Sequence, residues 1–400
     1  ILNDDTISDN IENNEFINDF AFQSLSSLNA KHVVFRPSKQ YKNSKIFNKV
    51  QNINFFDKLF LKTYPSAIFF SSFFSSAEKI YHNKVVFKYL VFKNKWLNFF
   101  IKNNIKVYLT WYKYWPENII INESIHEFNG ISCIWQRSFE AIPNIDNKII
   151  TDIYFSNSIE HSKTQLKNNS LIKAEVCVGS LGSYNLDYIK LKAEKIKMNL
   201  KNSGAEIIIG MFDQNSNSEY THQNERESYI SVIEQILINP KLGLVLKPKK
   251  IHSLYNRLGT DIKMLIHKAI DTGRCHIFTS STYSQSKTLL SLAALSSDIN
   301  ICTSLKAGTT AIESAVLDKR TLMLDREGNP QSCFYNNNFN SDNIVFSNWS
   351  DLLNALKDYI SSNQINNKFG NWKNHISYFD PYRDGNSQKR MGDYLNDLIV

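Results

Sequence analysis

The stretch AEIIIGMF (residues 205–212) leads through a helix-length segment to GLVLKP (residues 243–248), and it decides the fold. Both apolar runs are near-continuous, which is typical of strands buried on both faces of a parallel sheet. Residues 225–237 between them have helical spacing, so the stretch forms a strand–helix–strand unit. It predicts an α/β domain with helices on both faces of a parallel sheet.

The alternation of strand-like apolar runs and helix-length segments continues in both directions along the chain. We expect further strands at residues 32–37, 67–72, 105–110, 131–136, 152–156, 174–179, 275–280, 299–304 and 320–325. We expect further helices at 45–62, 159–167, 261–270, 287–295, 308–317, 349–360 and 388–398. Two such halves predict the GT-B architecture, in which two doubly wound, Rossmann-like domains face a ligand-binding cleft.

The expected organisation has five parts. They are a polar arm (1–30), an N-terminal Rossmann-like acceptor domain (31–183), a linker helix (184–203), a C-terminal Rossmann-like nucleotide-sugar domain (204–385) and a C-terminal helix (386–400). We expect a hinge at 180–184 and a last helix that crosses back onto the first domain. The chain begins at Ile1 without a signal pattern, so we expect one module of a longer protein.

Composition excludes several classes. With 42% hydrophobic and 21% charged residues, the 400-residue chain is neither disordered nor a single core. The net charge of +8 (46 basic minus 38 acidic residues) fits an acidic partner, or simply aids solubility. Five cysteines without a CxxC pair argue against a disulfide framework or zinc site, and predict free thiols in the cytoplasm.

The segment TSLKAGTTAIESAVLDKRTLML (residues 303–324) carries the most specific motif. A strand ends at Ser304, and a helix begins after Gly308 with Thr309 and Thr310, so free N–H groups there can bind a phosphate. Glu313 lies one helical turn further and suits a diol such as a ribose. The alternative is that a threonine only caps the helix.

Two more strand ends carry polar groups. Asp213 follows the strand at 205–212, where it could act as nucleophile or base, or only form an Asx turn. Lys247, Pro248 and Lys249 follow the strand at 243–248 and could bind an anion, or only form a basic turn.

In the first half, WQRSFEAIPN (residues 135–144) follows a strand. Gln136 and Arg137 could hold a sugar and its carboxylate, and Glu140 could act as acid or base. The alternative is a surface loop with an internal salt bridge.

Residues 84–115 combine seven lysines with many aromatic residues and no acidic one. We expect a helix with its aromatic side chains inside and its lysines outside, followed by a strand. The alternative is a surface that binds a membrane or an anionic polymer. The sequence contains no DxD, HExxH, GxxxxGK[ST] or GxGxxG motif, which argues against a GT-A metal site and against a dehydrogenase.

The combination of IWQRSFEA, GMFDQ, LKPKK and TSLKAGTTAIESA resembles the retaining β-Kdo transferase modules of bacterial O-antigen and capsule (lipopolysaccharide and polysaccharide) synthesis, from about residue 30 onward. This resemblance implies a CMP-Kdo donor, no metal or other cofactor, and a lipid-linked glycan acceptor. It also implies further domains of a larger polymerase, at the inner face of the cytoplasmic membrane, and no nucleic-acid partner.

The resemblance also implies roles for single residues. Asp213 would be the nucleophile, with Glu140 as second choice and otherwise as acid/base for the acceptor. Sugar contacts would come from Gln136, Arg137 and Gln214, and nucleotide contacts from Lys247, Pro248, Lys249, Ser304, Gly308, Thr309, Thr310 and Glu313. The Lys247–Pro248 pair stands where sialyltransferases carry His-Pro.

Two other functions stay open. One is an inverting GT-B transferase for CMP-sialic acid or a UDP-sugar, or the related sugar-nucleotide epimerase. The other is a non-catalytic basic module that binds an anionic glycan or nucleic acid, although no RRM, KH or helix-turn-helix signature is present.

Overall fold

The computed structural model describes two short strands near the amino terminus and most of the chain beyond residue 75. The described residues are 2–3, 33–34 and 76–398, with gaps at 112, 114–116, 181–185, 214–218, 250, 279–289, 306–307, 336–338, 340–341 and 363–367. The expected strand at 67–72 and helix at 45–62 lie outside them, as does most of the arm at 1–30.

The first sheet has six described strands, all parallel, in the order β2-β1-β3-β4-β5-β6. Their bounds are β1 (Leu2–Asn3), β2 (Val33–Val34), β3 (Val107–Thr110), β4 (Ile131–Trp135), β5 (Ile150–Ser156) and β6 (Leu171–Cys177). The central strands β3 and β4 are buried almost throughout, which explains their near-continuous apolar sequences.

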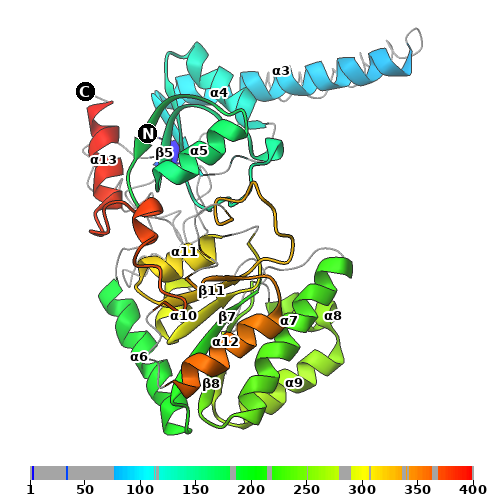
Figure 1. The fold of residues 1–400 in the computed structure, drawn as a ribbon. Helices are drawn as coiled ribbons and strands as arrows, with labels where there is room; N and C mark the ends of the chain where they lie inside the picture. The colour runs from blue at the N-terminus through cyan, green and yellow to red at the C-terminus, as the bar shows by residue number, and fades with distance from the viewer. Residues whose placement is uncertain are drawn as a thin grey trace, which may run out of the picture.

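The helices of this domain are α3 (Ala77–Asn103), α4 (Glu117–Glu127) and α5 (Ile159–Lys167), with a short 3-10 turn, η3 (Ile145–Asn147). Figure 1 shows α3 extending well beyond the rest of the upper domain. Its buried side chains are Phe87, Trp96 and Phe100, and β3 follows it. This confirms the expected helix with aromatic residues inside, followed by a strand.

The second sheet also has six described strands, all parallel, in the order β12-β11-β10-β7-β8-β9. Their bounds are β7 (Ile207–Phe212), β8 (Leu242–Lys247), β9 (Cys275–Ile277), β10 (Ile299–Cys302), β11 (Arg320–Leu324) and β12 (Val345–Phe346). The helices are α7 (Glu219–Ile238), α8 (Ile251–Leu258), α9 (Thr260–Asp271), α10 (Leu290–Leu295), α11 (Thr309–Val316) and α12 (Trp349–Ser361).

Both faces of the second sheet are covered by helices. Ile207 and Ile209 pack with α7, α8, α9 and α12, whereas Ile208 and Phe212 pack on the opposite face with α10 and the long helix α6 (Leu186–Asn202). Because successive strand residues alternate between faces, a strand that is buried on both sides must be apolar at nearly every position. This is the physical reason why residues 205–212 predict the fold.

The strand order places a ligand-binding position at β7. The chain runs from β7 outward through β8 to β9, and then returns to the other side of β7 as β10. In open α/β sheets, ligands bind at the carboxyl ends of the strands where the order reverses in this way. Asp213 follows β7 and Ser304 follows β10, so both lie at this switch point.

The chain crosses between the domains twice. After β6 it enters the second domain through α6, and after the 3-10 turn η5 (Ile376–Tyr378) it returns as α13 (Ser387–Asp397). Met391 and Leu395 of α13 join the core of the first sheet, beside Trp135 and Phe155. In Figure 1 this last helix accordingly lies against the upper domain, although the chain before it belongs to the lower one.

The structure also tests the expectations for the cysteines and for the bounds of single elements. The cysteines are free thiols, and Cys133, Cys275 and Cys302 are buried, as expected. Strand β9 ends at Ile277 rather than at residue 280, whereas α8 was not expected at all. No helix among the described residues is long and apolar enough to cross a lipid bilayer.

Candidate functional site

A pocket lies between the two domains, at the carboxyl ends of the strands. The space within it is about 410 Å³, including the part open to solvent. The first domain and the crossing after it contribute Trp135, Gln136, Arg137, Phe139, Asn157 and Ser180, and the second half of the chain contributes Thr309, Ile312, Glu313 and Phe379. Four residues that the sequence proposed for substrate binding, Gln136, Arg137, Thr309 and Glu313, therefore lie in one pocket.

On the first-domain side of the pocket, a hydrogen bond to the protein backbone fixes the side chain of Gln136. Gln136 Oε1 accepts a hydrogen bond from the backbone N–H of Asn157 at 2.7 Å, which ties the loop after β4 to the loop after β5. The guanidinium of Arg137 lies 3.9 Å from the ring centroid of Trp111, in a cation–π contact. Arg137 thus approaches the pocket as an ordered cation, which suits recognition of a carboxylate.

The opposite wall is the start of α11. Gly308 is the N-cap residue of this helix and has no side chain that could cap it. The backbone and Thr309 therefore form this wall. A Cβ atom at Gly308 would lie 2.9 Å from a ring carbon of Phe334 and 3.3 Å from one of Phe139. The glycine therefore lets the helix start approach the aromatic cluster that joins the two domains.

That aromatic cluster contains residues of both domains. Phe139 packs with Phe334 and Phe379 at centroid distances of 5.9 and 5.1 Å, and Phe334 packs in turn with Phe339 and Trp372. All five side chains are buried. The pocket therefore opens above a packed apolar contact.

The carboxyl group of Glu313 interacts electrostatically with one basic side chain from each domain. Burial raises the pKa of its carboxyl to about 7, and the positive charges of Arg137 and Lys247 act in the opposite direction. The pKa of Lys247 is lowered by burial, against the attraction of Asp213 and Glu313. Arg137, Glu313, Lys247 and Asp213 therefore form a series of alternating charges that begins in the first domain and ends at the β7 switch point.

Asp213 is buried and does not line the pocket. Its side chain is 0% exposed, and its Oδ1 accepts the backbone N–H of Lys249 at 2.5 Å. Its Oδ2 accepts from the Tyr229 hydroxyl at 3.2 Å and lies 3.5 Å from Arg257, whose guanidinium also pairs with Glu225 at 2.5 Å. Burial, followed by the charge of Glu225, raises the pKa of Asp213 to about 7.

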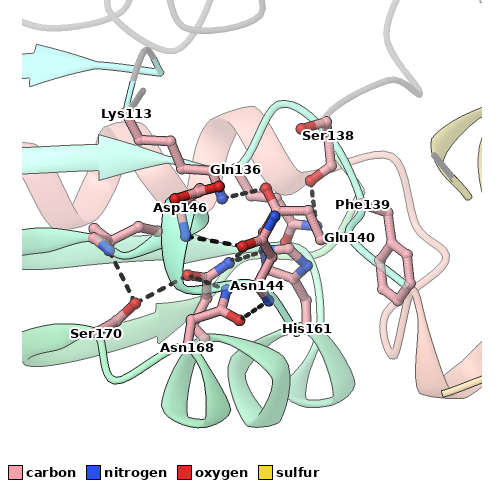
Figure 2. A network of polar contacts seen from close by, with 12 residues as sticks. Lys113, Gln136, Ser138, Phe139, Glu140, Asn144, Asp146, His161, Asn168 and Ser170 are labelled. Atoms are coloured by element: carbon pink, nitrogen blue, oxygen red, sulfur yellow. Dashed lines mark hydrogen bonds and ion pairs between the residues drawn. The ribbon is translucent and has the colours of Figure 1, made fainter. Parts of the chain in front are cut away.

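Glu140 is also buried and does not line the pocket. It forms a buried ion pair with Lys113, and Gln165 Nε2 donates a hydrogen bond to its second oxygen at 3.0 Å (Figure 2). This pair differs from the alternative of a surface loop with an internal salt bridge, because it is buried and Lys113 follows β3, outside residues 135–144. Its neighbour Phe139 lines the pocket, so Glu140 is one residue removed from it.

The other proposed residues have varied surroundings. Ser304 follows β10 and Thr310 lies in the first turn of α11, and both are half-buried. Thr303, directly after β10, donates a hydrogen bond from its hydroxyl to the Phe212 carbonyl at 3.3 Å. Pro248 is buried and Lys249 is exposed, and the backbone of Lys249 serves as the Asp213 partner. Gln214 lies outside the described residues.

Several pocket residues were missed by sequence analysis. Asn157 and Ser180 follow β5 and β6, and a systematic search of strand ends would have found them. Phe379 could not be found in this way, because it reaches the pocket only through the second crossing. Among the described residues, no three His, Cys, Asp or Glu side chains are grouped as a metal site requires.

Comparison with known proteins shows which solved structures have a similar fold. No family model matches the sequence, and no curated protein matches it. Among solved structures, UDP-GlcNAc 2-epimerase from Neisseria meningitidis bound to UDP-GlcNAc has a TM-score of 0.55 at 11% identity, over 99% of this chain and 100% of that chain.

Two further structures are similar to the same degree. A glycosyltransferase from Rickettsia africae has a TM-score of 0.55 at 14% identity, over 100% of this chain and 97% of that one. Anabaena HepE in complex with UDP and glucose has a TM-score of 0.54 at 9% identity, over 99% of each chain. At these identities the likeness concerns the fold, and it confirms the expected GT-B-like pair of Rossmann-like domains.

Proposed function

We propose that this protein is a glycosyltransferase that binds a nucleotide-activated sugar in the pocket between its two domains. The observation that carries the proposal is the meeting of Arg137 and Gln136 from one domain with the start of α11 and Glu313 from the other. The helix start offers free N–H groups to a phosphate, and Glu313 offers an acceptor to sugar hydroxyls. Ligands of this kind bind at this position in doubly wound folds.

Within this class, we propose CMP-Kdo as the donor. The proposal draws on the resemblance of IWQRSFEA, GMFDQ, LKPKK and TSLKAGTTAIESA to β-Kdo transferase modules. Kdo carries a carboxylate, and Arg137 is an ordered cation in the pocket wall that could pair with it. Lys247, beside Glu313, would neutralise the single phosphate of CMP together with the helix start, so that no metal is needed.

The proposed reaction retains the β configuration through two displacements. In the first, a carboxylate oxygen of Asp213 bonds to the anomeric carbon of Kdo, and the bond to the CMP phosphate breaks with its electron pair. In the second, the acceptor hydroxyl attacks the same carbon, its proton passes to Glu140, and the ester to Asp213 breaks. Because Asp213 is buried, this role requires its carboxylate to turn from Tyr229 and Arg257 toward the pocket.

The acceptor is proposed to be a lipid-linked glycan of a growing bacterial surface polysaccharide. This places the enzyme at the inner face of the cytoplasmic membrane, beside other domains of a larger polymerase. The charge of +8 supports an anionic substrate of this kind.

A UDP-sugar is the second candidate donor, and a specific observation favours it. Two of the similar structures contain UDP or UDP-GlcNAc. The two candidates differ in base and in the number of phosphates, so binding separates them directly.

The test is calorimetric titration of CMP, UDP, GDP and ADP, with and without EDTA, followed by CMP-Kdo turnover. Selective CMP binding that EDTA does not change, with a Kdo adduct on Asp213 by intact mass, is the expected result. Preference for UDP would replace the Kdo donor and leave the transferase proposal in place. No binding of any nucleotide, and no turnover, would contradict the proposal as a whole.

A further inference from the structure

A cluster of buried polar side chains lies beside the loop that carries Gln136 and Phe139, two residues that line the pocket (Figure 2). We call Lys113, Glu140, His161 and Gln165 the Lys113 cluster. Lys113 follows β3, Glu140 follows β4, and the other two lie in α5, which follows β5. The Lys113 and Glu140 side chains are only 7% and 8% exposed, and His161 and Gln165 are fully buried. Burying an ion pair costs free energy that well-packed apolar residues would not, so this cluster calls for an explanation.

Two side chains hold the carboxylate of Glu140. Lys113 Nζ pairs with Glu140 Oε1, and Gln165 Nε2 donates to Glu140 Oε2 at 3.0 Å. The Gln165 amide is oriented from its other side, because its Oε1 accepts a hydrogen bond from Ser170 Oγ at 3.1 Å. Both oxygens of the Glu140 carboxylate therefore have a partner.

The histidine of the cluster does not supply a second positive charge. Gln165 Nε2 lies 3.2 Å from His161 Nε2, and an amide N–H can only donate there, so this ring nitrogen accepts. Burial, followed by the charge of Lys113, lowers the pKa of His161 well below its usual range. The ring centroid of Tyr154 lies 6.0 Å from that of His161. Among the described residues of this cluster, the cation that faces Glu140 is Lys113.

The cluster is joined to the pocket through adjacent residues. The ring of Phe139, which lines the pocket, packs 5.4 Å from that of His161. Gln136, four residues before Glu140, also lines the pocket and bonds the Ser138 carbonyl at 3.3 Å. Because Glu140 itself does not line the pocket, a role in the reaction requires this short loop to shift toward the substrate.

We propose that Lys113 is the positioning residue that holds Glu140 as a carboxylate, ready to take the proton of the acceptor hydroxyl. This inference rests on the proposed function and makes Glu140 a base rather than an acid. In the first displacement CMP leaves as an anion and needs no proton. In the second, the acceptor O–H bond breaks, its proton goes to Glu140, the acceptor oxygen bonds to the anomeric carbon, and Asp213 recovers the electron pair of its ester.

The experiment compares wild type with Lys113→Met, Lys113→Arg and the control Lys163→Met. Lys163 pairs with Glu160 on the surface of α5 and is 59% exposed, so its loss should leave activity unchanged. In Lys113→Met, Glu140 loses the cation that pairs with it, and the acidic limb of the pH–rate profile for transfer should move to higher pH. The Asp213–Kdo adduct should still form and should accumulate below that limb. Lys113→Arg should restore the wild-type profile.

A uniform loss of rate at every pH, or an unchanged profile, would show that Lys113 serves only packing and would overturn the inference. Should Lys113→Met unfold, the charge-neutral double variant Lys113→Met, Glu140→Gln is compared with Glu140→Gln alone. Equal transfer rates support action through Glu140, whereas a further loss contradicts it. Wild type that turns over CMP-Kdo separates these outcomes from failure of the proposed function, because inactive wild type would overturn both proposals together.

Discussion

Thr309 Oγ1 accepts a hydrogen bond from the backbone N–H of Phe139 at 2.7 Å, and these two residues belong to different domains. The resemblance implies a nucleotide contact for Thr309. In the structure its hydroxyl joins the start of α11 to the loop after β4, and both residues line the pocket. The two walls of the pocket are therefore bonded directly to each other.

Replacing this threonine by valine should weaken the domain contact. Thr309→Val keeps the side-chain shape but leaves the Phe139 N–H without its acceptor, which should cost about 1–3 kcal/mol of unfolding free energy. Urea unfolding measures the loss. Thr310→Val is the matched control, because nothing in the described structure bonds its hydroxyl, and it should change stability by less than about 0.5 kcal/mol. Equal losses in both variants would contradict the assigned contact.

Removing Arg257 should be far more costly than removing a surface cation. Arg257 is the cation between Asp213 and Glu225, whose side chains are 0% and 4% exposed. Arg257→Met would leave two carboxylates buried together, and we expect a loss of about 3–5 kcal/mol in urea unfolding. Lys241→Met is the control, since Lys241 and Glu206 are 63% and 62% exposed and their pair should contribute about 0–1 kcal/mol. Similar losses in the two variants would argue that Arg257 does not hold this network together.

Asp213 should make stability fall as pH rises. Its pKa in the folded protein is raised to about 7, above the value of about 3.9 in an unfolded chain. A carboxyl with a raised pKa binds its proton more tightly when folded, so its contribution is most favourable below pH 4 and is lost between about 4 and 7. In Asp213→Asn this loss disappears. The stability of wild type relative to the variant should therefore drop by at least about 1.4 kcal/mol, one pKa unit, between pH 4 and 8. A constant difference across this range would contradict the assignment.

The sheet and its site position could be predicted because they depend on local patterns. Residues Ile207–Phe212 are apolar on both faces, which requires a strand between two helical layers. Gly308 and the residues after it mark a helix that begins at a strand end. The carboxyl ends of neighbouring parallel strands lie along the same side of the sheet. The proximity of Asp213 and Ser304 could therefore be predicted without any information on contacts.

The partners of these residues could not be predicted, because they depend on packing between distant segments. Asp213 meets Arg257 only because α8, a short helix that the sequence did not indicate, packs beside α7. Glu140 meets Lys113 only once β3 and β4 lie side by side. Sequence analysis therefore located polar groups at the correct ends of strands but took Asp213 and Glu140 for groups that face the pocket, whereas both are buried and neither lines it.

Nucleotide binding should strengthen as pH rises through 7, because of Glu313. Its pKa is raised to about 7, so half of the protein carries a neutral carboxyl at that pH. Ribose hydroxyls are best accepted by the ionised form, since a carboxylate accepts stronger hydrogen bonds than a neutral acid. Calorimetric titration of CMP at pH 6 and pH 8 should therefore give a tighter dissociation constant at pH 8. In Glu313→Gln, binding should weaken by about 1–3 kcal/mol at pH 8 and lose this component of its pH dependence. The phosphate of CMP titrates near pH 6 in both experiments, so the difference between wild type and variant isolates Glu313. Affinity of wild type that falls between pH 6 and 8 more steeply than that of Glu313→Gln would mean that the neutral carboxyl donates to the nucleotide, and would reverse the role assigned to Glu313.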